Sequence, residues 1–180
     1  MYKMFENMRN TVRTETNSRI FLDDPKKKDG KFTNYVSYIN HGTMDVITQP
    51  QVLMSVEGSE LLWILPWYIE NMRGEGSART GNIDGPIKVI GDPGVMSTGV
   101  IRQNAAGVTF PATLEASVFQ VFDIPGYGIL RNRARVTITA IVDELPPFDA
   151  LCKCDAALLY DEQNNIRGIV DGRALTILPT

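Results

Sequence analysis

The chain has 180 residues, of which 43% are hydrophobic and 22% are charged, and it carries a formal net charge of −3. This composition is that of a folded domain large enough to bury a sizeable core, which excludes an intrinsically disordered chain. The only basic run, Lys26 to Lys28, is flanked by aspartates that cancel its field, so no direct contact with nucleic acid is expected.

The N-terminus carries methionine and phenylalanine at helical spacing: Met1, Met4, Phe5 and Met8 would lie on one face of a two-turn helix. An isolated helix of this length is marginal in water, so the segment either frays or packs its apolar side chains on another surface. The first residues also lack the basic and apolar regions of a secretion signal. The sequence predicts an N-terminal arm or docked helix over residues 1–16, with its apolar face against a neighbouring subunit.

From residue 17 to residue 180, short β-type runs alternate with Gly, Asp-Gly and Pro turn signals, which predicts a single all-β domain. The strongest run spans residues 133–142, where apolar and polar residues alternate with a period of two. Its inward-facing side chains are predicted to be Val136, Ile138, Ala140 and Val142, and its outward-facing ones Arg135, Thr137 and Thr139. The whole pattern predicts an antiparallel, jelly-roll-like β-sandwich of about 8–10 strands.

One segment departs from this pattern of strands and turns. Pro66 fits the first turn of a helix and Gly74 fits the position after the last turn, so a short helix is predicted over residues 66–73. An edge strand bent at the proline is the alternative. The apolar run that contains this proline, 61–69, has about half the length of a membrane-spanning helix, and no membrane partner is expected.

Aromatic residues are densest at Trp63, Trp67 and Tyr68. Such a cluster is most often part of a core and next most often part of a protein contact, because these side chains bury a large area at a small entropic cost. The long glycine-rich stretch Gly74–Gly85, which contains Arg79, is typical of a functional or interface loop. The predicted interface therefore combines the N-terminal face, the aromatic cluster and Arg79.

No arrangement of residues matches a catalytic signature. His41, the only histidine, lies in an Asn-His-Gly turn and is interpreted as a solvated loop residue. Cys152 and Cys154 lie two residues apart on a predicted strand, where both point to one face and do not readily bond to each other. They are interpreted as buried structural thiols, since a zinc site needs a second pair of ligands. No catalytic residue, metal or cofactor is predicted.

These features predict a non-enzymatic structural subunit of a viral or phage particle: a decoration protein, a minor capsid protein, or a tail or neck component. The prediction rests on an analogy of fold class. Such a subunit would form a symmetric homo-oligomer, contact other particle subunits, and reside in the virion after synthesis in the host cytoplasm, with a cytoplasmic protein as the alternative.

Two further hypotheses remain open. The first is a ligand-binding β-sandwich module for carbohydrate or peptide, with Trp63, Trp67 and Tyr68 as an aromatic platform. The second is an enzyme whose site lies in the Gly74–Gly85 loop or around His41.

Overall fold

The computed structural model describes residues 7–56, 60–81 and 83–179, and the regular elements in these ranges are all β-strands. The strands are β1 (Arg9–Leu22), β2 (Asn34–Thr48), β3 (Val52–Val56), β4 (Glu60–Thr80), β5 (Pro86–Gly91), β6 (Ser97–Ala105), β7 (Val108–Val118), β8 (Gln120–Ile124), β9 (Gly128–Asn132), β10 (Val136–Val142), β11 (Leu151–Cys154), β12 (Ala157–Tyr160) and β13 (Ile166–Leu178). None of the described segments is an apolar helix of the length that a membrane span needs.

The strands form one antiparallel sheet that closes on itself, because the first strand pairs with the last. β1 pairs with β13 from Arg13 opposite Leu178 to Leu22 opposite Gly168. A further pairing, between β4 and β6, joins strands that are not neighbours in the main strand order. These two contacts turn the sheet into closed rings.

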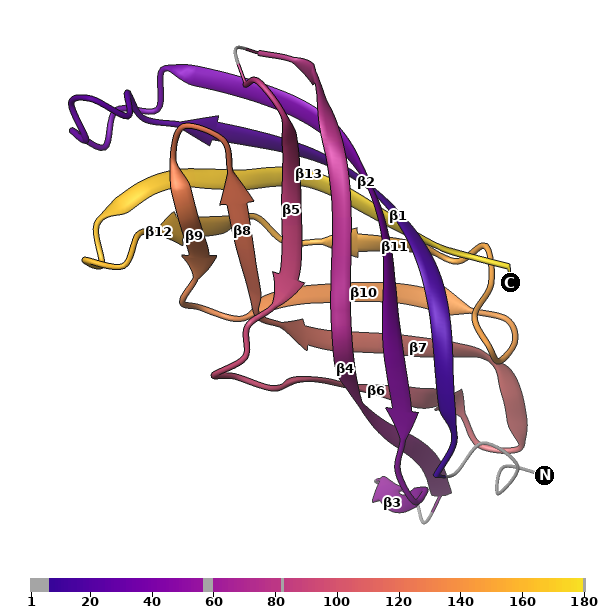
Figure 1. Ribbon diagram of the computed structural model, residues 1–180. Coiled ribbons are helices and arrows are strands. Elements are labelled where there is room, and N and C mark those ends of the chain that lie inside the picture. The colour runs from indigo at the N-terminus through magenta and orange to yellow at the C-terminus, as the bar shows by residue number, and fades with distance from the viewer. Residues whose placement is uncertain (1–6, 57–59, 82, 180) are drawn as a thin grey trace.

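Two barrels share the long strands β1, β2, β4 and β13 (Figure 1). The lower barrel of Figure 1 is completed by β6, β7, β10 and β11, and the upper barrel by β5, β8, β9 and β12. In Figure 1 the strands β1, β2 and β4 cross the strands β7, β10 and β11, so the lower barrel has two walls that face each other. We refer to these two rings as the lower barrel and the upper barrel.

Each barrel has its own hydrophobic core. The buried side chains of the lower core are those of Val12, Trp63, Leu65, Trp67, Ile101, Ala112, Leu114, Ala116, Val118, Val136, Ile138, Ala140, Val142, Cys152 and Ile177. Those of the upper core are Ile20, Leu22, Val36, Tyr38, Ile87, Val89, Phe122, Ile124, Leu130, Leu159 and Val170. β1 contributes to both cores from one face, which shows that its alternating pattern continues from one barrel into the other.

The strand predicted at residues 133–142 is confirmed from Val136 to Val142, which form β10, whereas residues 133–135 precede the strand. The four side chains predicted to face inward, Val136, Ile138, Ala140 and Val142, are all buried in the lower core. Arg135 and Thr139 are exposed and Thr137 is half-buried. The all-β, antiparallel class is likewise confirmed, whereas the jelly-roll-like sandwich is not: the described strands belong to a single closed sheet and not to two separate ones.

The helix predicted over residues 66–73 is wrong, because β4 runs through this segment. On one side, β4 pairs with β3 up to Ile64 and with β2 from Trp67, so Pro66 falls in the gap between these two partners. The Pro66 carbonyl accepts a hydrogen bond from the Gln49 amide in that gap, at 2.8 Å. The missing N–H of the proline therefore faces the β2–β3 connection, and no ladder bond is lost.

The predicted N-terminal arm over residues 1–16 overlaps β1, which begins at Arg9, so residues 9–16 belong to the sheet. The sequence pattern did not reveal this part of the strand, because residues 9–16 carry only one apolar side chain, Val12. Residues 1–6 lie outside the described residues.

β4 takes part in both barrels, and it bends where it passes from one to the other. Twenty-one residues at about 3.3 Å each would span about 70 Å if straight. One extra residue on β4 opposite β2 forms a bulge at Asn71, which has a φ of 50°. Beyond the bulge, Gly76 lies so close to β2 that a Cβ atom would stand 2.1 Å from the Ile39 carbonyl oxygen. The bend therefore depends on the bulge at Asn71, and the close approach to β2 depends on the missing side chain of Gly76.

Truncation of the upper core should be costly. Phe122 is 1% exposed in β8, and its change to Ala should lower the free energy of unfolding by about 3–5 kcal/mol through lost transfer energy and a cavity. Ile141, which is 60% exposed on the outer face of β10, provides the control, because Ile141→Ala should change stability by less than about 0.5 kcal/mol. Urea titration measures both, and equal losses would contradict the assignment of the faces.

A candidate ligand-binding cavity

The lower barrel encloses a cavity of about 130 Å³. Most of its wall is apolar, and the side chains that form it come from strands on both sides of the barrel, including Val12, Leu65, Trp67, Ile101, Leu114 and Ile138. A barrel of eight strands is just wide enough for side chains to fill it or for one small ligand to enter. Side chains fill the upper barrel, whereas the lower barrel keeps a space of the size of a small ligand.

Small residues on the wall create this space. Gly42 on β2 lies opposite Gly74 on β4, and Ala116 faces the cavity from β7. Gly99 on β6 lies directly opposite Trp67, and a Cβ atom at Gly99 would stand 2.2 Å from the Trp67 indole ring. The ring therefore lies flat against its own neighbouring strand and leaves the centre of the barrel open.

A group of polar side chains lies where the cavity approaches the upper core, next to Val89, an upper-core residue that also lines the cavity. Asn40 and Gln120 line the cavity, and Arg173 lies behind Gln120. The Arg173 guanidinium donates from Nη1 to Gln120 Oε1 at 2.7 Å and from Nη2 to the Asp155 carbonyl oxygen at 3.0 Å. Asn132 fixes the backbone here, because its Oδ1 accepts from the Gln120 amide at 2.7 Å. We call Asn40, Gln120 and Arg173 the polar layer.

The two buried arginines of β13 differ in their partners. Arg167, at the end of the upper barrel, has Asp23 Oδ2 at 2.8 Å and Asp161 Oδ2 at 3.6 Å, and Asp23 raises its pKa. Arg173 is 7% exposed and makes no ion pair with any carboxylate of the described residues. Burial lowers the pKa of Arg173 because removal from water disfavours the charged form. Arg173 is thus a buried cation without a counter-ion in the described chain.

Two buried polar atoms of the cavity lining, Trp67 Nε1 and Asn40 Oδ1, have no hydrogen-bond partner among the described residues. The same holds for Arg173 Nε, which lies behind Gln120 and not on the lining. The side-chain amide of Gln120 donates only to the thioether of Met72, at 3.5 Å, and a thioether is a weak acceptor. Nearly all buried polar groups in folded proteins are satisfied by protein, water or ligand. The cavity wall therefore offers hydrogen bonds that a bound molecule can complete.

The tyrosine next to the polar layer stays neutral. Tyr38 is 2% exposed at the lower edge of the upper core, and burial raises its pKa to about 12. A hydrogen bond with the Ser18 side chain acts in the opposite direction and is the smaller effect. Tyr38 therefore supplies no negative charge to Arg173 at neutral pH.

The cavity wall has little of the chemistry that catalysis requires. Its lining contains no carboxylate and no imidazole among the described residues, and its only charged side chain is that of Arg73. Cys152 lies on the wall, where burial raises its pKa to about 11 and keeps the thiol protonated. A protonated thiol is a poor nucleophile.

Of the residues predicted from the sequence as an interface, those that the structure describes lie at separate places. Met1, Met4 and Phe5 lie outside the described residues, and Met8 is exposed next to Thr48. Trp63 and Trp67 are buried in the lower core, Tyr68 is half-buried, and Arg79 is exposed near the end of β4. The role of these residues in an interface stays a prediction.

Other residues considered in the sequence lie outside the cavity or on its wall. His41 is on the outer face of β2, with its Nδ1 3.7 Å from Glu15 Oε2. The stretch 74–80 is strand and not loop. Cys152 and Cys154 both contribute to the lower core, Cys152 buried and Cys154 partly buried, as expected for thiols on one face of a strand. The predicted absence of a metal at these thiols stays a prediction.

Sequence reasoning missed all three members of the polar layer. Asn40 was read as part of a turn, and Gln120 and Arg173 carried no visible signal. One extra residue of β13 opposite β1 forms a bulge between Asp171 and Ala174, so that Arg173 and Val170 both face the interior although they are three residues apart. A strict period of two would put one of them outside. An arginine in an otherwise apolar strand was the only available hint.

No protein-family model matches the chain, and no curated protein matches it. Among solved structures, the chain is similar to DynF from the dynemicin biosynthesis pathway of Micromonospora chersina, with a TM-score of 0.75 and 17% sequence identity. The similarity covers 96% of this chain and 81% of that one. At this identity it shows a shared fold.

This comparison overturns the predicted role in a viral or phage particle and the predicted location in the virion. The solved structure that shares the fold is a protein of a biosynthesis pathway. The particle role rested on an analogy with sandwich folds, and the described strands form a closed sheet instead. Self-association, a cytoplasmic location and the absence of enzymatic activity stay predictions.

The position of Cys152 on a closed wall predicts slow modification. In the wild-type protein, iodoacetamide at pH 8 should alkylate Cys152 about a hundredfold more slowly in the native state than in urea, since a pKa raised from 9.0 to about 11 lowers the thiolate fraction by about that factor. Trypsin cleaves after Lys153 and so separates Cys152 from Cys154 for the assay. Mass spectrometry of timed samples measures the rate. Equal rates in the two states would show that the thiol is open to solvent.

Proposed function

We propose that the protein binds a small, largely apolar molecule inside the lower barrel. The observation that carries this proposal is the mainly apolar cavity of about 130 Å³ inside the lower barrel, with unsatisfied polar atoms in its wall. Apolar cavities of about 150 Å³ in other proteins take up molecules of the size of benzene. The fold shared with a protein of the dynemicin biosynthesis pathway agrees with a role in small-molecule chemistry.

The cavity lowers the free energy of unfolding, and its presence despite this loss supports a function for it. Unfilled volume destabilises a core by about 24 cal/mol per Å³, so a cavity of 130 Å³ corresponds to about 3 kcal/mol. The upper barrel, built on the same four long strands, is closed by large side chains such as Phe122, Leu130 and Leu159. The same architecture can therefore be filled with side chains, and the lower barrel is not.

The site differs from the aromatic platform considered from the sequence. Trp63 and Trp67 are 3% and 7% exposed, so they do not form an open surface on which a sugar or a peptide can stack. Trp67 instead presents its indole to the closed cavity. A ligand of this site is enclosed on many sides, which favours a compact small molecule over a polymer.

The connection between β10 and β11 is the part of the cavity wall that suits an entrance. Leu145, Pro146 and Pro147 of this loop line the cavity. β13 ends at Leu178 opposite Arg13, so the first residues of β1 have no partner in β13 and lie next to the space that this loop covers. A hydrogen bond from the Asp149 amide to the Ile177 carbonyl oxygen, at 2.8 Å, holds the loop to β13. Loops of this kind open more easily than strand ladders do.

The proposal predicts binding of a small neutral aromatic molecule. Benzene should bind, as measured by isothermal titration calorimetry, and Ala116→Phe should weaken its binding at least about tenfold, because the new ring occupies the cavity. Glu115→Phe is the matched control, since it places the same ring on the outer face of β7 one residue away. Circular dichroism and thermal melting confirm folding of both variants. Benzene binding that is equal in all three proteins, or absent from the wild type, would contradict the proposal.

A further inference from the structure

We infer that the ligand of the lower barrel is an apolar acid, whose oxygen anion is held by Arg173 and Gln120 while its apolar body fills the cavity. This inference rests on the proposed function and specifies the class of ligand. It follows from three features of the polar layer: where Arg173 lies, what surrounds its charge, and which hydrogen-bonding groups are left over.

The position of Arg173 is fixed by the fold. The bulge in β13 turns this side chain inward between the two cores, and two hydrogen bonds hold its guanidinium there. One of these bonds goes to Gln120, which lines the cavity, so the cation lies directly behind the inner end of the cavity. The guanidinium is therefore pre-organised, and a ligand would not bear the cost of ordering it.

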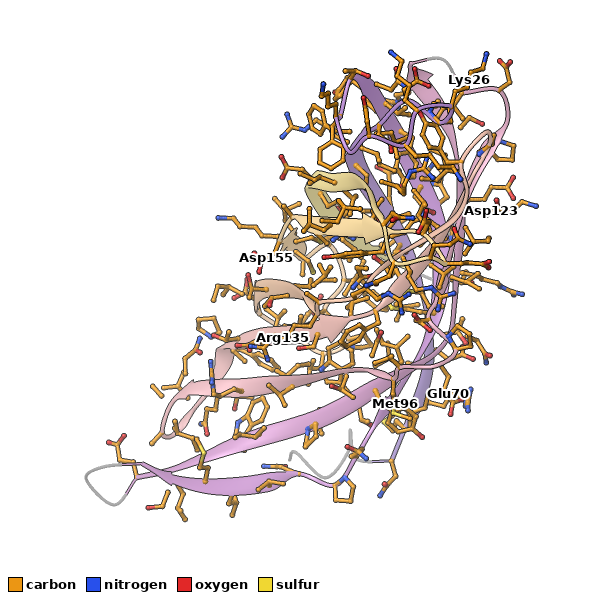
Figure 2. The ribbon with its side chains drawn as sticks, turned by 90° about the vertical axis from the view of Figure 1, so that its left-hand side faces the viewer. Lys26, Glu70, Met96, Asp123, Arg135 and Asp155 are labelled. Atoms are coloured by element: carbon orange, nitrogen blue, oxygen red, sulfur yellow. The ribbon has the colours of Figure 1, made fainter. Side chains whose placement is uncertain are left out.

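The charge of Arg173 is not neutralised by the described chain. The carboxylates of Asp155 and Asp171 favour the charged form from a distance, but neither comes within 4 Å of the guanidinium. Asp155 lies at the outer surface (Figure 2), and only its backbone carbonyl faces Arg173. Asp171 is paired with Arg19 on the neighbouring strand, at 3.6 Å. A buried charge of this kind is stabilised by a partner of opposite charge.

The hydrogen-bonding groups that remain at the inner end are mainly donors. Arg173 Nε has no acceptor among the described residues, and Gln120 Nε2 has only the Met72 sulfur. Asn40 Oδ1 is the one acceptor in this set. An anionic oxygen accepts several hydrogen bonds and donates none, so it matches this surplus of donors better than an alcohol or an amine does.

The cavity wall indicates what the remainder of the ligand is like. Its wall is mainly apolar, with threonines and Asn10 as further polar residues, and the only charged side chain of its described lining is Arg73, which is exposed. An inorganic anion alone would leave this apolar surface empty. A molecule with one acidic end and an apolar body complements both parts of the site.

Two ligands with the same body test this inference. Benzenesulfonate differs from benzene by its sulfonate group alone. The wild-type protein should bind benzenesulfonate at least about tenfold more tightly than benzene in isothermal titration calorimetry, because a hydrogen bond to a buried charge adds about that much affinity. Ala116→Phe should weaken the binding of both ligands, which locates them in the cavity. Inorganic sulfate at the same concentration should displace neither ligand.

Substitutions of Arg173 assign the preference to this side chain. Arg173→Met should remove the advantage of the sulfonate and change the affinity for benzene by less than about threefold, since Met replaces the apolar stem of the arginine and removes only its charged end. Arg173→Lys should retain part of the advantage. Circular dichroism and melting curves show whether each variant is folded, and the wild-type comparison of the two ligands stands even if Arg173→Met does not fold.

The outcomes separate the inference from the proposed function. Equal affinity for benzene and benzenesulfonate, or a preference that persists in folded Arg173→Met, would overturn the inference and leave small-molecule binding intact. Displacement by inorganic sulfate would replace an apolar acid by a simple anion and would also overturn it. Failure of both ligands to bind would overturn the proposed function, and the inference with it.

Discussion

The pairing of β1 with β13 is the contact on which the rest of the structure depends. It joins strands from opposite ends of the sequence over a register that runs from Arg13 and Leu178 to Leu22 and Gly168. Without it the sheet would have two long free edges and no enclosed interior. The cavity, the polar layer and the division into two cores all exist because this seam is closed.

The strand β13 carries two buried arginines that differ in how their charges are compensated. β13 places Arg167 in an ion pair at the end of the upper barrel and Arg173 without one between the two barrels. The first arrangement resembles an ordinary buried ion pair, whose charges offset each other's desolvation. The second keeps a desolvated charge and surplus donors next to empty space, which is a familiar property of sites that are completed by a ligand.

The sequence predicted local features well and long-range features poorly. The alternation in β10 identified its buried side chains, because a period of two is a local property of the strand. Pro66 was misread as the start of a helix, since the gap between β2 and β3 that accommodates it involves a distant strand. Arg173 could not be recognised, because the bulge that turns it inward exists only relative to β1. The closure of the sheet has no signature in composition or spacing.

The four strands that run through both barrels have a consequence for how the molecule opens. Because β1, β2, β4 and β13 carry hydrogen bonds of both rings, neither barrel can lose its backbone structure while the other keeps its own. The two cores are separate in packing but form a single cooperative unit in unfolding. Occupation of the lower barrel would therefore slow amide hydrogen exchange in the shared strands up to the far end of the upper one, where no ligand reaches.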